Sequence, residues 1–274
     1  MQHTNIEWVQ NPDGTQGYTW NPITGCLNHV NGLCKGGGFP CYAYRLANGR
    51  LRQRYLANKN TATTNYDEDS YPFYPRFWPE RLNSIGQPND WGYNQVKHPK
   101  GIFVCDMSDL FGIGIPEEWT EEVLGEIVRW PEHRFYLLTK QPQNLIKWSP
   151  FPDNCYVGVT ACNQKAHNEA VVVLAYIEAN TKFISHEPLL EHISLHPPYS
   201  PEDAYDWDII GSQTKPYRPP AIGDVQEIVK ACDKAGVAVF LKDNLMPLII
   251  DQPKVPSWSS DNKKLKQEMP RGER

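Results

Sequence analysis

Three cysteines lie close together near the start of the sequence, in a segment that is rich in glycine. Cys26, Cys34 and Cys41 belong to one loop, residues 25–41, which a strand-like run precedes and a helix-like pattern follows. The glycines let the backbone of this loop turn freely. Thiolates are ligands of zinc and of iron–sulfur clusters, so three of them on one loop indicate a metal centre. The glycines are Gly25, Gly32, Gly36, Gly37 and Gly38.

Two kinds of metal centre are compatible with this loop. Seven residues separate Cys26 from Cys34 and six separate Cys34 from Cys41, so the paired spacing of a zinc knuckle is absent. His29 can complete a Cys₃His zinc site. An iron–sulfur cluster held by three thiolates instead leaves one iron open to a substrate or cofactor. Structural zinc requires four protein ligands, which favours the open cluster.

Composition limits the class of protein. The 274 residues have a net charge of −5 and are 40% hydrophobic, which is ordinary for a globular chain and excludes a broad basic surface. No apolar run is long enough for a transmembrane helix, and the N-terminal residues lack a signal peptide, so we expect a cytoplasmic protein with reduced thiols. The scattered cysteines are interpreted as core residues: Cys105, Cys155, Cys162 and Cys232.

Strand-like runs alternate with helix-like segments along the chain, which predicts an α/β fold with a parallel sheet. Eight strands are the number in a TIM-like (β/α)₈ barrel or partial barrel, and an open doubly wound sheet is the alternative. We expect a single domain over residues 1–250, with the cysteine loop 25–41 and an insertion at 59–100, followed by a polar tail at 251–274. The predicted strands are Tyr18–Ile23, Phe73–Trp78, Gly101–Asp106, His133–Thr139, Cys155–Thr160, Lys182–His186, Trp207–Gly211 and Val237–Lys242. The predicted helices are Tyr42–Ala57, Pro116–Trp130, Asn144–Trp148, Gln164–Asn180 and Pro220–Gly236.

Polar residues follow these strands directly. In parallel α/β folds the functional groups gather beyond the carboxyl ends of the strands, so these residues are expected to share one rim with the cysteine loop. A residue that merely caps the next helix would look the same in the sequence. The rim candidates are Asp106, Asp109, Thr139, Lys140, His186, Glu187 and Lys242.

Several motifs occur in a characteristic order along nearly the whole chain. They include TWNPITGC (Thr19–Cys26), CYAYRLA (Cys41–Ala47), IFVCDMSDLFG (Ile102–Gly112), LLTKQPQNL (Leu137–Leu145) and FISHEPLL (Phe183–Leu190). With them, the sequence resembles a phage-associated domain-of-unknown-function family that accompanies three-Cys-motif partner proteins. That family is itself similar to radical S-adenosyl-L-methionine (SAM) enzymes.

The resemblance implies a TIM-like barrel with a 4Fe–4S cluster on the three loop cysteines and SAM on the open iron. Reductive cleavage of SAM would give a 5′-deoxyadenosyl radical that abstracts hydrogen from a substrate. It also implies that Tyr42 lies near the cluster or the adenine, and that Lys242 binds an anionic substrate group. Candidates for contacts with SAM or substrate are Asp106, Asp109, Thr139, Lys140 and Glu187, and Lys140, Glu187 and Lys242 are the candidate catalytic groups.

Three functions therefore remain open. The first is a radical SAM-type enzyme acting on an unknown substrate, with a nucleic acid or nucleotide as candidate and a three-Cys-motif protein as candidate partner. The second is a zinc-stabilised barrel that acts as a binding or scaffold protein, or as a hydrolase with Glu187 and His186 as acid/base groups. The third is a non-catalytic scaffold for another polypeptide. Interleaved basic and aromatic residues indicate a local nucleic-acid groove or an ordinary solvated face: Arg45, Arg50, Arg52, Arg54, Tyr55, Arg76, Phe77, Trp78 and Arg81.

Overall fold

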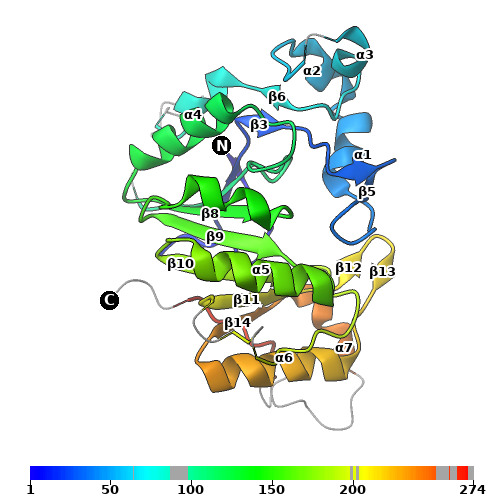
Figure 1. The fold of residues 1–274 in the computed structure, drawn as a ribbon, viewed down its shortest axis with the longest axis vertical. Coiled ribbons are helices and arrows are strands. Elements are labelled where there is room, and N and C mark those ends of the chain that lie inside the picture. The colour runs from blue at the N-terminus through cyan, green and yellow to red at the C-terminus, as the bar shows by residue number, and fades with distance from the viewer. Residues whose placement is uncertain are drawn as a thin grey trace. The chain divides into compact units, whose positions relative to one another are not determined.

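The computed structural model describes residues 1–63, 65–86, 98–197, 200–201, 204–250, 259 and 264–270. These residues form two compact units, which are described separately (Figure 1). The first unit comprises residues 1–141 and 152–155, and the second comprises 142–151 and 156–274. Part of the expected insertion at 59–100 and most of the expected tail at 251–274 lie outside the described residues.

The largest sheet of the described residues has eight strands, and the first unit contains four of them. Their order is β1 (Gln2–His3), β2 (Tyr18–Trp20), β7 (Gly101–Val104) and β8 (Arg134–Thr139). β2, β7 and β8 pair in parallel, and β1 is antiparallel to β2. Helix α4 (Glu117–Val128) connects β7 to β8 and buries one apolar face, as its periodicity predicts.

The second unit contains four parallel strands, β9 (Cys155–Thr160), β10 (Thr181–His186), β11 (Trp207–Ile210) and β14 (Ala238–Leu241), in that order. Figure 1 shows α5 and α6 lying along these strands. The helices and the remaining short elements are α5 (Gln164–Tyr176), α6 (Ile222–Ala235), α7 (Pro247–Ile250) and the hairpin of β12 (Gln213–Thr214) with β13 (Tyr217–Arg218), and 3₁₀ turns at Pro142–Asn144, Ile146–Trp148 and Asp243–Leu245.

The termini of the second unit's helices follow from local sequence. The Asn163 side chain accepts a hydrogen bond from the amide of Ala166 and caps α5. Helix α6 ends at Gly236, whose φ of 72° is the left-handed conformation that glycine adopts without strain. No helix in the described part of the chain has the length and apolar character needed to cross a bilayer.

The mixed α/β class with mostly parallel strands is confirmed. A closed barrel is not shown, because in each unit the described strands form an open row of four. The TIM-like barrel therefore stays a prediction.

The second predicted strand, Phe73–Trp78, is wrong as a member of the parallel sheet. Only β6 (Arg76–Phe77) is extended, and it pairs antiparallel with β3 (Ile23–Thr24) in a separate two-stranded sheet. Pro75 directly precedes β6 and Pro79 follows shortly after it, and proline cannot donate a ladder hydrogen bond. In the first unit the edge position beside β2 belongs to the antiparallel β1 instead.

A long connection, residues 21–100, joins β2 to β7. After the cysteine loop it carries α1 (Tyr42–Asn48) and α2 (Arg52–Ala57), where the sequence predicts one helix. Gly49 interrupts this helix with φ −109° and ψ −117°, values that are not helical. The connection continues through α3 (Tyr66–Asp69) and a 3₁₀ turn, Pro79–Ser84.

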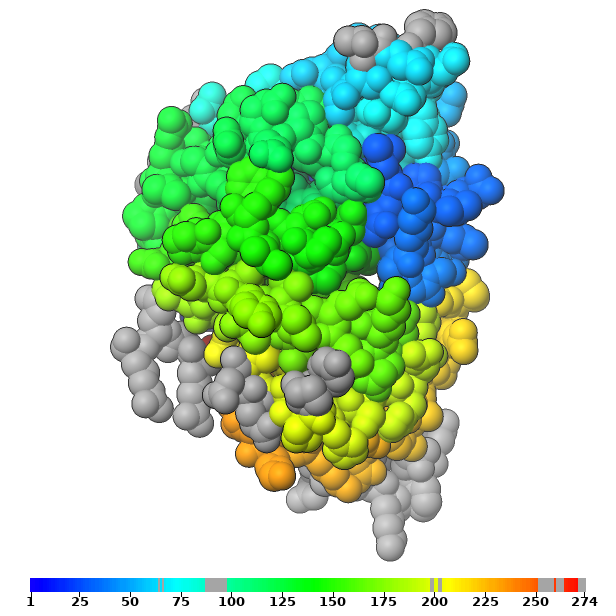
Figure 2. Space-filling model, in the orientation of Figure 1, coloured from blue at the N-terminus to red at the C-terminus, as the bar shows by residue number. Residues whose placement is uncertain are grey.

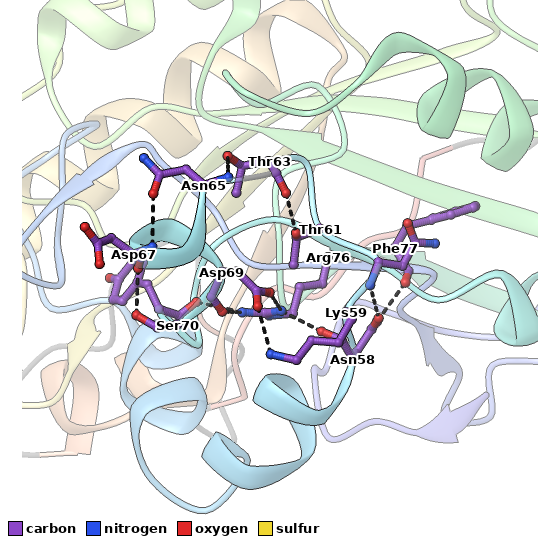
Figure 3. A network of polar contacts seen from close by, with 12 residues as sticks. Asn58, Lys59, Thr61, Thr63, Asn65, Asp67, Asp69, Ser70, Arg76 and Phe77 are labelled. Atoms are coloured by element: carbon purple, nitrogen blue, oxygen red, sulfur yellow. Dashed lines mark hydrogen bonds and ion pairs between the residues drawn. The ribbon is translucent and has the colours of Figure 1, made fainter.

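The buried guanidinium of Arg76 ties this connection together (Figure 3). Its Nη1 donates to the carbonyl of Asn58 at 2.6 Å and to Oδ1 of Asp69 at 3.2 Å, and its Nη2 donates to the carbonyl of Tyr71 at 3.0 Å. The Asn58 side chain in turn donates to the carbonyl of Phe77 at 2.7 Å. One cation thereby holds the end of α2, the end of α3 and β6 in one arrangement.

We predict that Arg76→Met destabilises the protein by about 3 kcal/mol, because several buried carbonyl groups and a carboxylate lose their donor together. Urea unfolding followed by circular dichroism measures this. The matched control is Lys59→Met, since Lys59 pairs with the same Asp69 but its side chain is 67% exposed. The control should lose less than about 1 kcal/mol. Equal losses in the two variants would contradict the proposed role of Arg76.

Candidate metal centre

The cysteine loop folds back on itself through a short hairpin. β4 (His29–Val30) pairs with β5 (Leu33–Cys34), and the turn between them has positive φ at Asn31 (49°) and Gly32 (81°), as in a type I′ turn. The Cys41 amide then donates to the Gly32 carbonyl at 2.8 Å. This fold-back brings the segment before Cys41 alongside the hairpin. The Asn31-Gly32 pair is the sequence signal for this hairpin, and the hairpin is not among the elements predicted above.

Cys26 is fixed by a glycine that precedes it. Gly25 has φ +89°, and its amide donates to the carbonyl of Met107 at 3.0 Å. A Cβ at Gly25 would lie 2.3 Å from the carbonyl oxygen of Tyr74, so no other residue fits. The Cys26 amide donates to the carbonyl of Phe73 at 3.0 Å. The first thiol therefore sits between the loop after β7 and the segment before β6.

Two of the three sulfurs accept a backbone N–H bond. Cys26 Sγ accepts from the amide of Asn28 at 3.3 Å, and Cys41 Sγ accepts from the amide of Tyr44 at 3.4 Å, which caps α1. The backbone amide of Gly36 lowers the pKa of the Cys34 thiol. Amide donors aimed at sulfur stabilise the thiolate form, which is the form that binds metals. Figure 2 shows the cysteine loop (blue) at the surface of the molecule.

Cys26 and Cys34 share the same charged neighbours. Burial and then the charge of Asp109 raise the pKa of Cys26 to about 12, against the lowering effects of the Asn28 amide and of Lys140. Burial also raises the pKa of Cys34, while Lys140 lowers it and the charges of Cys41 and Asp109 raise it. Asp109 and Lys140 thus act on both thiols.

The stem of Lys140 lies against the loop at Gly36. A Cβ at Gly36 would lie 3.4 Å from Cβ of Lys140 and 3.7 Å from Sγ of Cys34. The carboxylate of Asp109 positions Lys140 by accepting from its amide at 3.0 Å, and it also accepts from the amide of Phe111 at 3.2 Å. Asp109 therefore joins the loop after β7 to the end of β8. Thr139, the residue before Lys140, is 1% exposed, and its hydroxyl accepts a hydrogen bond from the amide of Gln141.

Tyr42, the residue that follows Cys41, contacts Asp106. The Tyr42 hydroxyl donates to the carbonyl of Asp106 and lies 3.4 Å from its Oδ2. The side-chain amide of Asn21 donates to Oδ1 of Asp106 at 2.5 Å, and its oxygen accepts from the amide of Met107 at 3.0 Å. Burial raises the pKa of Asp106. Asn21 was missed because the predicted strand ran on to Ile23, whereas β2 ends at Trp20.

His29 is not oriented as a fourth ligand. Its Nδ1 accepts from the amide of Gly32 at 3.3 Å, so its other nitrogen carries the proton and meets the hydroxyl of Tyr71 at 3.2 Å. The imidazole packs among the rings of Tyr44, Tyr71 and Phe73, and burial lowers its pKa. In the described residues, no three His, Cys, Asp or Glu side chains are close enough to hold a single metal ion.

The second unit holds the three remaining candidates. Lys242 lies just beyond β14, is 8% exposed and forms an ion pair with Glu187, just beyond β10. His186 is fully buried, and both of its ring nitrogens have protein partners. Its Nδ1 lies 2.8 Å from Oδ1 of Asp208, and its Nε2 lies 3.2 Å from Nδ1 of His167. An acid/base role for His186 on a substrate therefore has no geometric support. The structure thus groups the three cysteines, Tyr42, Asp106, Asp109, Thr139 and Lys140 in the first unit, and pairs Glu187 with Lys242 in the second.

Comparison with known families gives one match, to a family model described as "protein of unknown function (DUF5131)", over residues 3–246. The chain belongs to this DUF5131 family. The match includes every candidate residue of both units. No curated protein and no solved structure matches this DUF5131 member.

We predict that Cys26 of the metal-free protein reacts slowly with iodoacetamide at pH 8. A pKa near 12 instead of its ordinary 9.0 leaves roughly a thousandfold less thiolate than in an unfolded chain. Lys140→Met should slow the reaction of Cys26 and Cys34 further, because the neighbouring cation is lost. Mass-spectrometric peptide mapping measures this, with Lys100→Met as the charge-matched control. Faster alkylation in Lys140→Met would contradict the proximity of Lys140.

The same shift predicts how pH affects stability. Because folding raises the pKa of Cys26, its contribution to stability is complete below pH 9 and is lost as the pH rises toward 12. Thermal unfolding of the metal-free protein should therefore occur at a lower temperature as the pH rises through this range. Cys26→Ala should flatten this dependence.

Proposed function

We propose that this DUF5131 protein is a radical SAM-type iron–sulfur enzyme, in which Cys26, Cys34 and Cys41 hold a 4Fe–4S cluster. The observations that carry the proposal are that the sulfurs of Cys26 and Cys41 accept backbone N–H bonds and that the charge of Lys140 lowers the pKa of both Cys26 and Cys34. Anionic sulfur in a buried site needs such compensation. A set of ordinary core cysteines would not need it, and the buried thiol of Cys155 is affected by desolvation alone.

The donor set fits a cluster with an open iron. Three thiolates leave one iron of a cubane without a protein ligand. Zinc would require a fourth ligand, and His29 has both ring nitrogens in hydrogen bonds within the loop. The zinc-stabilised alternative therefore needs a rearrangement of His29 or a ligand from elsewhere.

When bound, the cluster and SAM supply the electron and the sulfonium whose cleavage gives methionine and a 5′-deoxyadenosyl radical. The chain's own groups prepare the site. The amides of Asn28 and Tyr44 donate to the sulfurs of Cys26 and Cys41 and would stabilise their thiolate forms once the cluster binds, and the rings of Tyr44 and Phe73 exclude water from one side.

The polar residues around the loop have distinct parts in this proposal. Asp106, held by Asn21 and Tyr42, offers a carboxylate for the ribose or amino group of SAM. Lys140 offers an ammonium for the SAM carboxylate, and Asp109 positions Lys140 through its amide. In the second unit, Lys242 neutralises Glu187 until an anionic substrate group replaces that carboxylate.

The substrate and the biological setting rest on resemblance. We propose a nucleotide or nucleic acid as substrate, a three-Cys-motif protein as partner and a phage-associated role. The basic and aromatic residues of the connection between β2 and β7 support the substrate class.

Anaerobic reconstitution with iron and sulfide tests the cluster. We expect about four irons and four sulfides per chain, and 5′-deoxyadenosine from SAM after reduction. Cys26→Ala, Cys34→Ala and Cys41→Ala should each lose the iron and the product. Cys155→Ala is the matched control, because it also removes a buried thiol. A colourless protein with one zinc and no sulfide would contradict the proposal. Iron that persists when all three cysteines are replaced together would also contradict it.

His29→Gln separates the cluster from the Cys₃His zinc site. The cluster proposal predicts full iron loading in this variant, with about 1 kcal/mol lost from the aromatic packing around the ring. A zinc site that uses His29 predicts loss of metal instead. Metal analysis together with urea unfolding distinguishes the two outcomes, and metal loss in a stably folded variant would favour zinc.

A further inference from the structure

A pocket in the first unit is lined by residues other than the three loop cysteines. It has a volume of about 240 Å³ and lies between α2 and the 3₁₀ turn Pro79–Ser84. Its wall contains two arginines and one carboxylate, together with aromatic and apolar side chains. The lining residues that matter here are Trp20, Asn21, Arg54, Tyr55, Glu80 and Arg81.

The two arginines converge on one indole ring. The guanidinium carbon of Arg81 lies 3.8 Å from the ring centroid of Trp78, and that of Arg54 lies 5.9 Å from it. Trp78 is itself fixed, since it is 7% exposed and its indole N–H donates to Thr24 at 2.8 Å. Two positively charged guanidinium groups thus lie near the same indole ring.

Arg81 is positioned but keeps most of its donors. Its Nη1 donates to the carbonyl of Asn21 at 2.8 Å, and its own carbonyl accepts from the indole of Trp20 at 2.8 Å. A guanidinium has five N–H donors, and across the described residues only this one makes a protein hydrogen bond. The remaining donors are available to a ligand.

The two arginines lack a close acidic partner in the part of the chain that the structure describes. Neither Arg54 nor Arg81 has a carboxylate oxygen of the described residues within 4.0 Å, although Glu80 also lines the pocket. Burial and then the charge of Arg54 lower the pKa of Arg81 to about 10, and Glu80 opposes this with a smaller effect. The site therefore carries excess positive charge that an anion would relieve.

The chain builds this arrangement through the polar network of Arg76. Figure 3 shows Asn58, at the end of α2, bonded to Phe77, the residue before Trp78. Arg54 on α2 is thereby held beside the segment that carries Trp78 and Arg81. The convergence of the two guanidiniums is thus a product of the fold.

We propose that this pocket binds the phosphate group of a nucleotide, with Arg54 and Arg81 as its ligands. Arginine pairs bind phosphate oxygens through several parallel N–H bonds, and two guanidiniums match the double charge of a phosphate monoester. The volume exceeds that of a phosphate alone, so part of the attached sugar can enter. Asn21 contacts both Arg81 and Asp106, so the pocket adjoins the proposed metal centre, but phosphate binding does not depend on a cluster.

Calorimetric titration of the full chain tests this site. AMP should bind at least about tenfold more tightly than adenosine, and the difference should shrink at high salt. Arg54→Gln should weaken AMP binding about tenfold or more, and Glu80→Gln should strengthen it. The matched control is Arg52→Gln, an exposed arginine of the same helix that does not line the pocket, which should change the affinity less than about twofold.

A second pair of probes identifies the source of the phosphate. A 5′-phosphorylated oligonucleotide that binds more tightly than AMP indicates a strand end as the natural ligand, and the reverse order indicates a free nucleotide. Equal effects of Arg54→Gln and Arg52→Gln, or equal binding of AMP and adenosine, would show that the two arginines serve only to pack against Trp78. Iron loading of Arg54→Gln should be unchanged, so failure here is distinguishable from failure of the proposed cluster.

Discussion

Buried sulfur can carry negative charge only where dipoles or cations replace water. This constraint accounts for the groups that surround the loop cysteines in the first unit. Desolvation opposes the thiolate forms of Cys26 and Cys34. Backbone amides of the loop donate to two of the sulfurs, those of Cys26 and Cys41, and the charge of Lys140, just after β8, lowers the pKa of Cys26 and Cys34. The arrangement lowers the cost of forming thiolates in a place from which water is largely excluded.

The connection between β2 and β7 carries the candidate metal ligands of this unit. It provides the three thiols and, further along, the two arginines that share Trp78. Two groups of contacts keep this long segment in place. Gly25 and Asn21 tie its start to the loop after β7, and Arg76 ties its middle together through buried carbonyl groups. The candidate metal centre and the proposed anion pocket can therefore adjoin each other although their residues are far apart in the sequence.

Much of the candidate centre was predictable, and the misses have identifiable causes. Cysteine spacing beside glycines pointed to Cys26, Cys34 and Cys41, and the position after a strand pointed to Lys140. Asn21 was missed because an apolar run made β2 look longer than it is. His29 looked like a ligand because a sequence shows which residues are near one another and not which hydrogen bonds their ring nitrogens make.

The sequence by itself determined most strands of the sheet and the helices between them. Apolar periodicity and the residues at helix ends, such as Asn163 and Gly236, are local signals, so helices α4 to α6 follow from them, as do the strands β7, β8, β9, β10, β11 and β14. Tertiary structure decided the rest, because the rest depends on contacts between distant residues. Proline near β6 turned an apparent strand of the sheet into half of a small separate pair, and the buried charge of Arg76 selected how the connection folds. The position of Lys140 beside sulfur, and of Arg54 beside Arg81, likewise required the whole first unit to pack, since no local pattern specifies which distant side chains share a buried environment.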